Sequence, residues 1–153
     1  MFTAIDSVPL TAIAFFMLTG ELMTSATITD RLVALSRALI GRIRGGLAQV
    51  NVLVSMFFAG MNGSVVADTA TVGALVLPAM KKAGYPAAFS AAVTGVSSTI
   101  GGIIPPSIMM IVLANATEIS IASLFAAGIV PGILIGVVTV SYTHLTLPTT
   151  PYV

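Results

Sequence analysis

Long apolar stretches alternate with short polar interruptions along the chain. Five stretches are rich in aliphatic residues and in Ala, Met and Phe: 8–28, 45–60, 64–80, 86–116 and 119–140. At 1.5 Å per residue, 8–28 and 119–140 are long enough to cross a hydrocarbon core of roughly 30 Å. The arms 45–60 and 64–80 reach only about 24 Å each as helices. The pattern predicts an all-α membrane protein with two arms too short to span.

The composition supports the bilayer as the solvent. The chain is 57% hydrophobic and 7% charged, whereas soluble domains carry roughly a quarter charged residues. A net charge of +1 provides no basic surface for nucleic acid. There is no cysteine, and the single histidine, His144, has no partner at metal-ligand spacing. Disulfides, thiolate metal sites and nucleic-acid binding are therefore excluded.

The basic residues indicate which loops face the cytoplasm. They fall into two groups: Arg31, Arg37, Arg42 and Arg44 in one, Lys81 and Lys82 in the other. Basic loops remain on the cytoplasmic side, and both short arms lie between these groups. We therefore predict a re-entrant hairpin over 45–80 that enters from the cytoplasm and turns near mid-membrane at Asn62-Gly63-Ser64. A set of plain spanning helices is the alternative.

The remaining organisation follows from this hairpin. We expect a span over 8–28, an amphipathic connector over 29–44, a broken helix over 86–116 and a returning span over 119–140, which together make one membrane domain, 1–140. The opening residues carry no basic signal-peptide region, and we expect a preceding part of a longer protein. The Thr/Pro-rich tail 141–153 has no helical periodicity, and we expect it to be foreign to the fold; a C-terminal loop is the alternative.

Two interruptions put non-helical backbone inside apolar sequence. One is the hairpin tip, Met61–Ser64, and the other is Thr99–Pro106, where a Gly pair and a Pro pair follow in succession. In a bilayer such backbone survives only where protein or an aqueous cavity covers it. Carbonyl groups at the ends of half-helices suit a hard cation such as Na⁺, and broken helices that meet at mid-membrane point to a transporter binding site. Close packing by small residues is the alternative.

Hydroxyl and carboxylate groups lie close to both interruptions. Ser97 and Ser98 precede the break and add oxygen atoms, and Asp68 lies one turn into the returning arm. An acid inside the membrane is a candidate functional group, but Asp68 also fits a structural role at the start of its half-helix, and both roles stay open. No second carboxylate or histidine lies within helical reach of Asp68, so we predict no enzymatic activity.

Several motifs occur together in a recognisable order. They are GELM at 20–23, RGG at 44–46, NGS-x-x-AD at the tip, PAMKKAGY at 78–85 and SSTIG-x-IIPPS at the break. From about Asp6 to Val140 the chain resembles the large membrane subunit of tripartite ATP-independent periplasmic (TRAP) transporters, the DctM-like family. The resemblance implies an ion-transporter-type fold of inverted repeats, of which one half is present here.

The same resemblance implies a function. Such subunits are multi-pass proteins of the bacterial inner membrane that import organic acids, carboxylates or sialic acid, with Na⁺ as the coupling ion and no organic cofactor. Their partners are a small TRAP membrane subunit and a periplasmic substrate-binding protein. A channel-like protein with a re-entrant selectivity loop is the alternative function. Such a loop does not require a second interruption in the helix that follows.

The resemblance also assigns residues to a first-repeat sodium site. These are Asn62, Gly63, Ser64, Thr99, Gly101 and Gly102, with Pro105 and Pro106 shaping the break. The family often has Ser-Gly-Ser at the tip, where this chain has Asn62, and often has Pro where this chain has Gly102. Neither departure removes an oxygen ligand.

Overall fold

The computed structural model describes residues 8–40 and 45–146, and every regular element within these ranges is helical. The elements are α1 (Val8–Ser25), α2 (Ile28–Ile40), α3 (Gly46–Asn62), α4 (Val65–Lys82), α5 (Ala87–Thr99), the 3₁₀ helix η2 (Ile100–Gly102), α6 (Ile108–Thr117) and α7 (Ile121–Thr146). For the described residues, the prediction of an all-α chain is confirmed. Asp6, Arg42, Arg44 and the end of the tail lie outside them.

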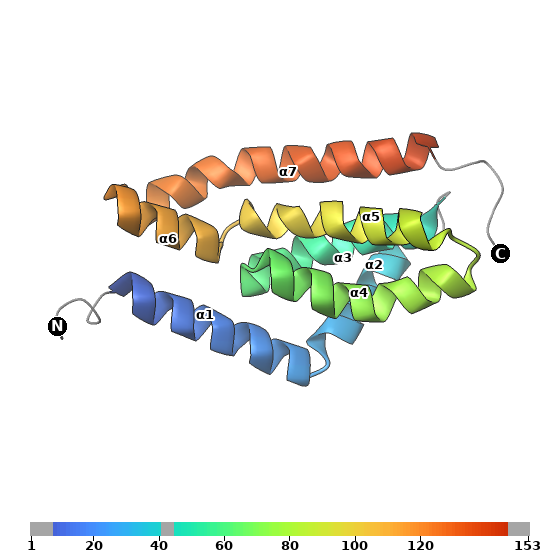
Figure 1. The fold of residues 1–153 in the computed structure, drawn as a ribbon, viewed down its shortest axis with the longest axis horizontal. Coiled ribbons are helices and arrows are strands. Elements are labelled where there is room, and N and C mark those ends of the chain that lie inside the picture. Colours follow the sequence, from blue (N-terminus) through green and yellow to red (C-terminus); the bar gives the residue numbers. More distant parts are fainter. Residues whose placement is uncertain (1–7, 41–44, 147–153) are drawn as a thin grey trace.

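The hairpin arms and the broken helix form the centre of the molecule. Helices α3 and α4 lie antiparallel and are joined by a two-residue turn, Gly63-Ser64 (Figure 1). Because α3 extends through Asn62, the non-helical tip is two residues shorter than predicted. Helices α5 and α6 follow one another across a break made of η2 and residues 103–107. Helix α5 therefore runs parallel to α3, and both end where the tip meets the break (Figure 1).

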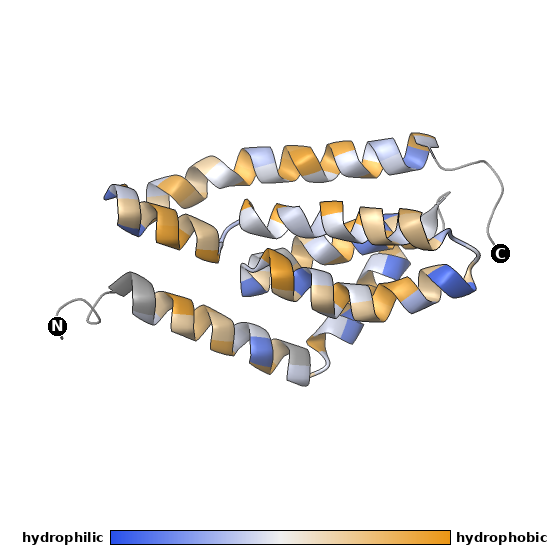
Figure 2. Ribbon diagram, in the orientation of Figure 1, coloured by the Kyte–Doolittle hydropathy of each residue, from blue (hydrophilic) through white to orange (hydrophobic). Residues whose placement is uncertain are grey.

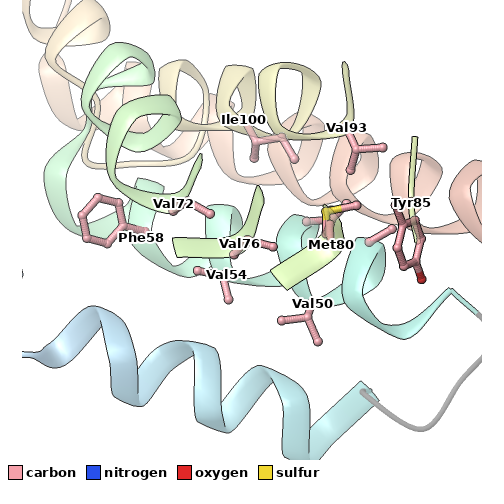
Figure 3. Close-up of a cluster of buried hydrophobic side chains, with 11 residues drawn as sticks. Val50, Val54, Phe58, Val72, Val76, Met80, Tyr85, Val93 and Ile100 are labelled. Carbon is pink, nitrogen blue, oxygen red and sulfur yellow. The ribbon is translucent and has the colours of Figure 1, made fainter. Parts of the chain in front are cut away.

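Side chains spaced four residues apart build the apolar core between α3, α4 and α5. Figure 3 shows them as one cluster: Val50, Val54 and Phe58 from α3, Val72, Val76 and Met80 from α4, with Tyr85, Val93 and Ile100. Residues four apart share one face of a helix, so each of these sets forms one apolar stripe. Ala48 and Val52 of α3 are buried as well, because α3 has neighbouring helices on several sides. The phenyl group of Phe58 and the side chain of Met80 are almost completely buried.

The outer surface is also apolar. On α7 the side chains of Val130 and Leu134 are 71% and 60% exposed, and Figure 2 shows hydrophobic residues along most of this helix. By length and composition, Ile121–Thr146 can cross a membrane, and its most apolar 18 residues have a mean hydropathy of 2.4. Thr11–Met23 and Ile28–Ile40, which meet at a bend of 70°, are together also long and apolar enough to be a broken span or a re-entrant loop. Exposed apolar area of this extent indicates contact with lipid or with other apolar surfaces.

Helix α7 extends six residues beyond the predicted end of the span at Val140, so residues 141–146 are helical and the alternative of a C-terminal loop is wrong for them. The hydroxyls of Ser141, Thr143 and Thr146 donate to carbonyls four residues earlier at 2.7–2.8 Å. Because these hydroxyls form their hydrogen bonds with carbonyls of α7 itself, they do not interrupt the helix.

The hairpin tip docks directly onto the break. The Ile108 N–H, at the start of α6, donates to the Gly63 carbonyl at 3.1 Å. Gly63 has φ +61°, and a Cβ added there would lie 2.5 Å from the Pro106 carbonyl oxygen. Only glycine combines this backbone conformation with so close an approach. A Cβ added to Gly102 would lie 3.3 Å from Cγ2 of Val65, so the break touches both sides of the turn.

Three glycines let α7 pack against the same region. Gly128, Gly132 and Gly136 are buried and spaced four apart on one face of α7. A Cβ at Gly128 would lie 2.5 Å from the Ile103 carbonyl oxygen, and one at Gly132 would lie 2.5 Å from a side-chain atom of Ile104. Small residues at this spacing allow helices to approach closely in membranes. The break is therefore held between the hairpin tip and α7.

We expect Val65→Cys combined with Gly102→Cys to form a disulfide, because the atoms named above lie within the range that a disulfide bridges. The chain has no other cysteine. A lysine-specific protease cuts at Lys81 or Lys82, between the two positions, and the two fragments should stay joined on a non-reducing gel. Val65→Cys with Gly95→Cys is the control, since a Cβ at Gly95 has no neighbour within 4 Å. Separation of the fragments in the first pair would contradict the docking.

We expect Gly128→Ala to destabilise the fold by about 1–3 kcal/mol, because the added methyl meets a backbone carbonyl that cannot rotate away. Gly136→Ala should cost less, since its neighbour is the flexible end of Met56. Gly95→Ala is the matched control and should be neutral or stabilising, because alanine favours helix by about 1 kcal/mol over glycine. Thermal unfolding in detergent, followed by circular dichroism, ranks the three variants; equal melting temperatures would refute close packing of α7.

Candidate cation site

Proline chemistry opens carbonyl groups at the break. In a continued α-helix the N–H groups of residues 105 and 106 would bond to the carbonyls of Gly101 and Gly102, but Pro105 and Pro106 have no N–H. The Gly102 carbonyl accepts instead from the Ser107 hydroxyl at 2.9 Å. Among the bonds of the described residues, the Gly101 carbonyl has no such replacement. The break therefore presents an open oxygen that is buried with its residue.

The hairpin tip contributes further oxygen atoms. The Asn62 side-chain oxygen accepts from the Ser64 N–H at 3.1 Å, and the Ser64 hydroxyl caps α4 by accepting from the Ala67 N–H at 3.3 Å. The Gly63 carbonyl accepts from Ile108. Carbonyl and hydroxyl oxygens have two lone pairs, so each of these oxygens retains capacity for a cation. The donor set consists of neutral oxygens, and oxygen is the ligand atom that hard cations prefer.

The structure brings together most, but not all, of the residues assigned to this site from the sequence. Asn62, Gly63 and Ser64 lie at the tip, and Gly101 and Gly102 belong to the break that touches it. The Thr99 side chain is exposed, and its hydroxyl donates to the Val96 carbonyl at 2.6 Å. Thr99 therefore contributes no hydroxyl to this group. Pro105 and Pro106 contribute indirectly: because they have no N–H group, the carbonyls of Gly101 and Gly102 lose their helical hydrogen-bond donors.

A cavity of about 160 Å³ opens beside the tip. Its lining includes Asn62 and Ser64 from the tip, Thr71 from α4, and Gly20 and Glu21 from α1. A Cβ added to Gly20 would lie 2.9 Å from Cβ of Asn62, so α1 packs tightly against this side of the tip. The amide nitrogen of Asn62 is buried and has no hydrogen-bond partner. The cavity gives the tip a polar opening next to α1.

A second polar group lies one turn below the tip, between α3, α4 and α5. The Asp68 carboxyl interacts with the hydroxyls of Ser55 and Ser98, and all three side chains are completely buried. None of their oxygen atoms makes a hydrogen bond of good geometry. Ser97, the neighbouring candidate, instead donates to the Val93 carbonyl at 2.6 Å.

The sequence-based assignment missed three polar residues: Asn51, Ser55 and Ser107. Asn51 and Ser55 lie four apart within a mostly apolar arm, a spacing that places them on one helical face. That spacing was the available signal. The bond from Ser107 to Gly102 depends on how the break folds and has no comparable pattern in the sequence.

Comparison with known proteins gives concordant matches. Residues 1–150 match the family model described as "Tripartite ATP-independent periplasmic transporter, DctM component". The chain is 44% identical over 138 residues to the C4-dicarboxylate TRAP transporter large permease protein DctM of Pseudomonas aeruginosa, which covers 90% of this chain and 32% of that protein. It is 40% identical over 144 residues to the sialic acid TRAP transporter large permease protein SiaM of Vibrio cholerae, covering 93% of this chain and 34% of that protein.

A third relative is the 2,3-diketo-L-gulonate TRAP transporter large permease protein YiaN of Escherichia coli, 44% identical over 131 residues, covering 86% of this chain and 31% of that protein. The chain thus spans about a third of the length of the relatives it matches. The family model covers nearly the whole chain, and the tip and break motifs lie inside the matched residues. This chain belongs to the DctM family, the large membrane component of tripartite ATP-independent periplasmic transporters.

Proposed function

We propose that this chain is part of a sodium-coupled permease for organic acids, and that the junction of tip and break holds the sodium ion. The observation that carries the proposal is the docking of Gly63 onto residues 106–108, beside the open carbonyl of Gly101. Two non-helical segments far apart in sequence meet there with oxygen atoms to spare. Junctions of discontinuous helices are where secondary transporters bind their ions.

The placement of charged residues supports a re-entrant hairpin. Lys81 and Lys82 end α4, whereas Glu118 follows α6 at the opposite end of the molecule. In Figure 1 the hairpin turn lies partway along the long axis, and α1, α6 and α7 extend beyond it. With the basic end in the cytoplasm, the tip lies within the membrane and α7 crosses it. On this arrangement we propose that the chain is a multi-pass part of a bacterial inner-membrane protein.

The chain's own residues would bind the ion and organise the site around it. Asn62, Ser64 and the carbonyls of Gly63, Gly101 and Gly102 supply oxygens, and Gly63 allows the two backbones to approach. When bound, sodium supplies positive charge next to the path of an anionic substrate. The core beneath the tip, with Phe58 and Val72, excludes water from one side, which strengthens electrostatic interactions there.

The substrate class follows from the relatives. Their names specify C4-dicarboxylate, sialic acid and 2,3-diketo-L-gulonate, all of which are organic acids. We propose that a permease containing this chain imports an organic acid, and that a small membrane subunit and a periplasmic binding protein assist it. The binding protein would present the substrate at the side of Glu118.

The test uses a permease of full family length that contains this sequence, reconstituted in liposomes with its small subunit and binding protein. We expect uptake of a labelled organic acid from a panel of dicarboxylates, sialic acid and sugar acids only with an inward sodium gradient. Gly63→Ala should reduce uptake at least about tenfold, because the left-handed conformation costs roughly 1–2 kcal/mol for alanine and its Cβ meets Pro106. Gly60→Ala is the matched control, since its Cβ would make ordinary contacts at 3.7 Å or more.

Uptake that proceeds without sodium would refute the coupling. Uptake or ion current that needs no binding protein would refute the permease assignment and favour a channel with a re-entrant loop. Equal uptake by Gly63→Ala and Gly60→Ala would remove the tip from the mechanism.

A further inference from the structure

The carboxyl group of Asp68 is buried with no charge to balance it. Its exposure is 0%, and neither oxygen has a hydrogen-bond partner. Among the described residues no lysine or arginine forms an ion pair with it; Lys81, on the same helix, is 13 residues away, about 20 Å along α4. An unpaired charge inside the membrane costs several kcal/mol. Something must offset that cost.

The hydroxyls that face Asp68 differ from their neighbours. On α5 the buried hydroxyls of Ser90, Thr94 and Ser97 each donate to the carbonyl four residues earlier, at 3.1, 2.9 and 2.6 Å. The Ser98 hydroxyl makes no such bond, and neither does that of Ser55 on α3. Both are completely buried. Among the buried hydroxyls of α3 and α5, the two without a partner are therefore the two next to the carboxyl group.

One turn below, a direct hydrogen bond fixes the spacing of the two flanking helices. The Asn51 amide donates to the Thr94 hydroxyl at 2.7 Å. Helices α3 and α5 run in the same direction, so the residues four further on, Ser55 and Ser98, lie level with each other. The bond between Asn51 and Thr94 thus holds the two serine hydroxyls on either side of Asp68. The amide oxygen of Asn51 is also buried without a partner.

The position of Asp68 on its helix offsets part of the cost of a buried negative charge. This residue lies in the first turn of α4, where the helix dipole stabilises a carboxylate. One carboxylate with two hydroxyls makes an oxygen site of charge −1. Such a site matches a hard monovalent cation, whereas calcium takes six to eight oxygen ligands and several carboxylates.

We propose that Asp68, Ser55 and Ser98 form a second sodium site, one turn below the junction of tip and break. It differs from the junction in chemistry, because it contains a carboxylate where the junction has neutral oxygens. The inference rests on the proposed function only for the identity of the ion. With both sites occupied, the hairpin would carry two sodium ions, and the lower ion would neutralise the buried carboxylate.

The test measures sodium directly on the purified 153-residue chain in lipid nanodiscs. Equilibrium dialysis with radioactive sodium should give two ions per chain. Infrared difference spectra with and without sodium, at constant ionic strength in choline, should show a change in a carboxylate band. Asp68→Asn should lose one ion and this band change. Circular dichroism confirms that each variant retains its helix content.

Matched serine variants keep the test sharp should Asp68→Asn fail to fold. Ser98→Ala and Ser55→Ala should each raise, by about tenfold, the sodium concentration at which the carboxylate band change is half complete. Ser97→Ala, adjacent and equally buried, should leave it unchanged, because its hydroxyl is bound to Val93. Equal effects of Ser97→Ala and Ser98→Ala would overturn the proposal.

The two sites fail in distinguishable ways. Gly63→Ala should lose one ion and retain the carboxylate signal. A single bound ion that Gly63→Ala abolishes and Asp68→Asn leaves in place would overturn this inference and leave the proposed function intact. A carboxyl group that stays protonated at every sodium concentration would also overturn it. One ion lost only in Asp68→Asn would support the second site and remove sodium from the junction.

Discussion

The backbone contact between the hairpin turn and the break before α6 organises this molecule. The hydrogen bond from the Ile108 N–H to the Gly63 carbonyl joins the turn of the hairpin to the start of α6. Non-helical backbone within an apolar chain needs partners, because each unsatisfied group costs several kcal/mol in hydrocarbon. The turn provides a hydrogen-bond acceptor for the break, and the break provides a donor for the turn. The polar oxygens of the candidate site are what remains after this mutual pairing.

The distribution of polarity is the reverse of that in a soluble protein. Large apolar side chains such as Val130 and Leu145 face outward, while Gln49, Asn51, Ser55 and Asp68 are completely buried. In water a chain hides its apolar groups; in lipid it can leave these exposed and must instead cover the polar ones. Asn51 and Ser55 of α3 therefore face the interior between the hairpin and α5, and Gln49 donates to the Val140 carbonyl of α7. The apolar core of Figure 3 lies beside these polar groups.

The turn and the break, which glycine and proline mark, were predictable from the sequence. The features that depend on tertiary contacts were not. Gly63, Pro105 and Pro106 signal the turn and the break through backbone chemistry that acts locally. Two features depend on how separate helices meet, which a single sequence does not show. One is the bond from Ser107 to Gly102. The other is that the Ser98 hydroxyl does not donate to a carbonyl of its own helix. The last span was predicted to end at Val140 because the residues after it are rich in Ser, Thr and Pro, although serine and threonine hydroxyls can donate to carbonyls within a helix. Thr99 was grouped with the site by its place in a motif, yet its side chain lies on the exposed face of α5.

The loop between η2 and α6 is clasped from opposite sides. Gly63 rests against its end at residues 106–108, and Gly128 and Gly132 of α7 rest against Ile103 and Ile104. A loop packed on both sides has little room to change its conformation. Should the hairpin shift relative to the lipid, the clasped loop and α7 must travel with it as one mechanical unit, and any bending has to occur at connections outside this unit.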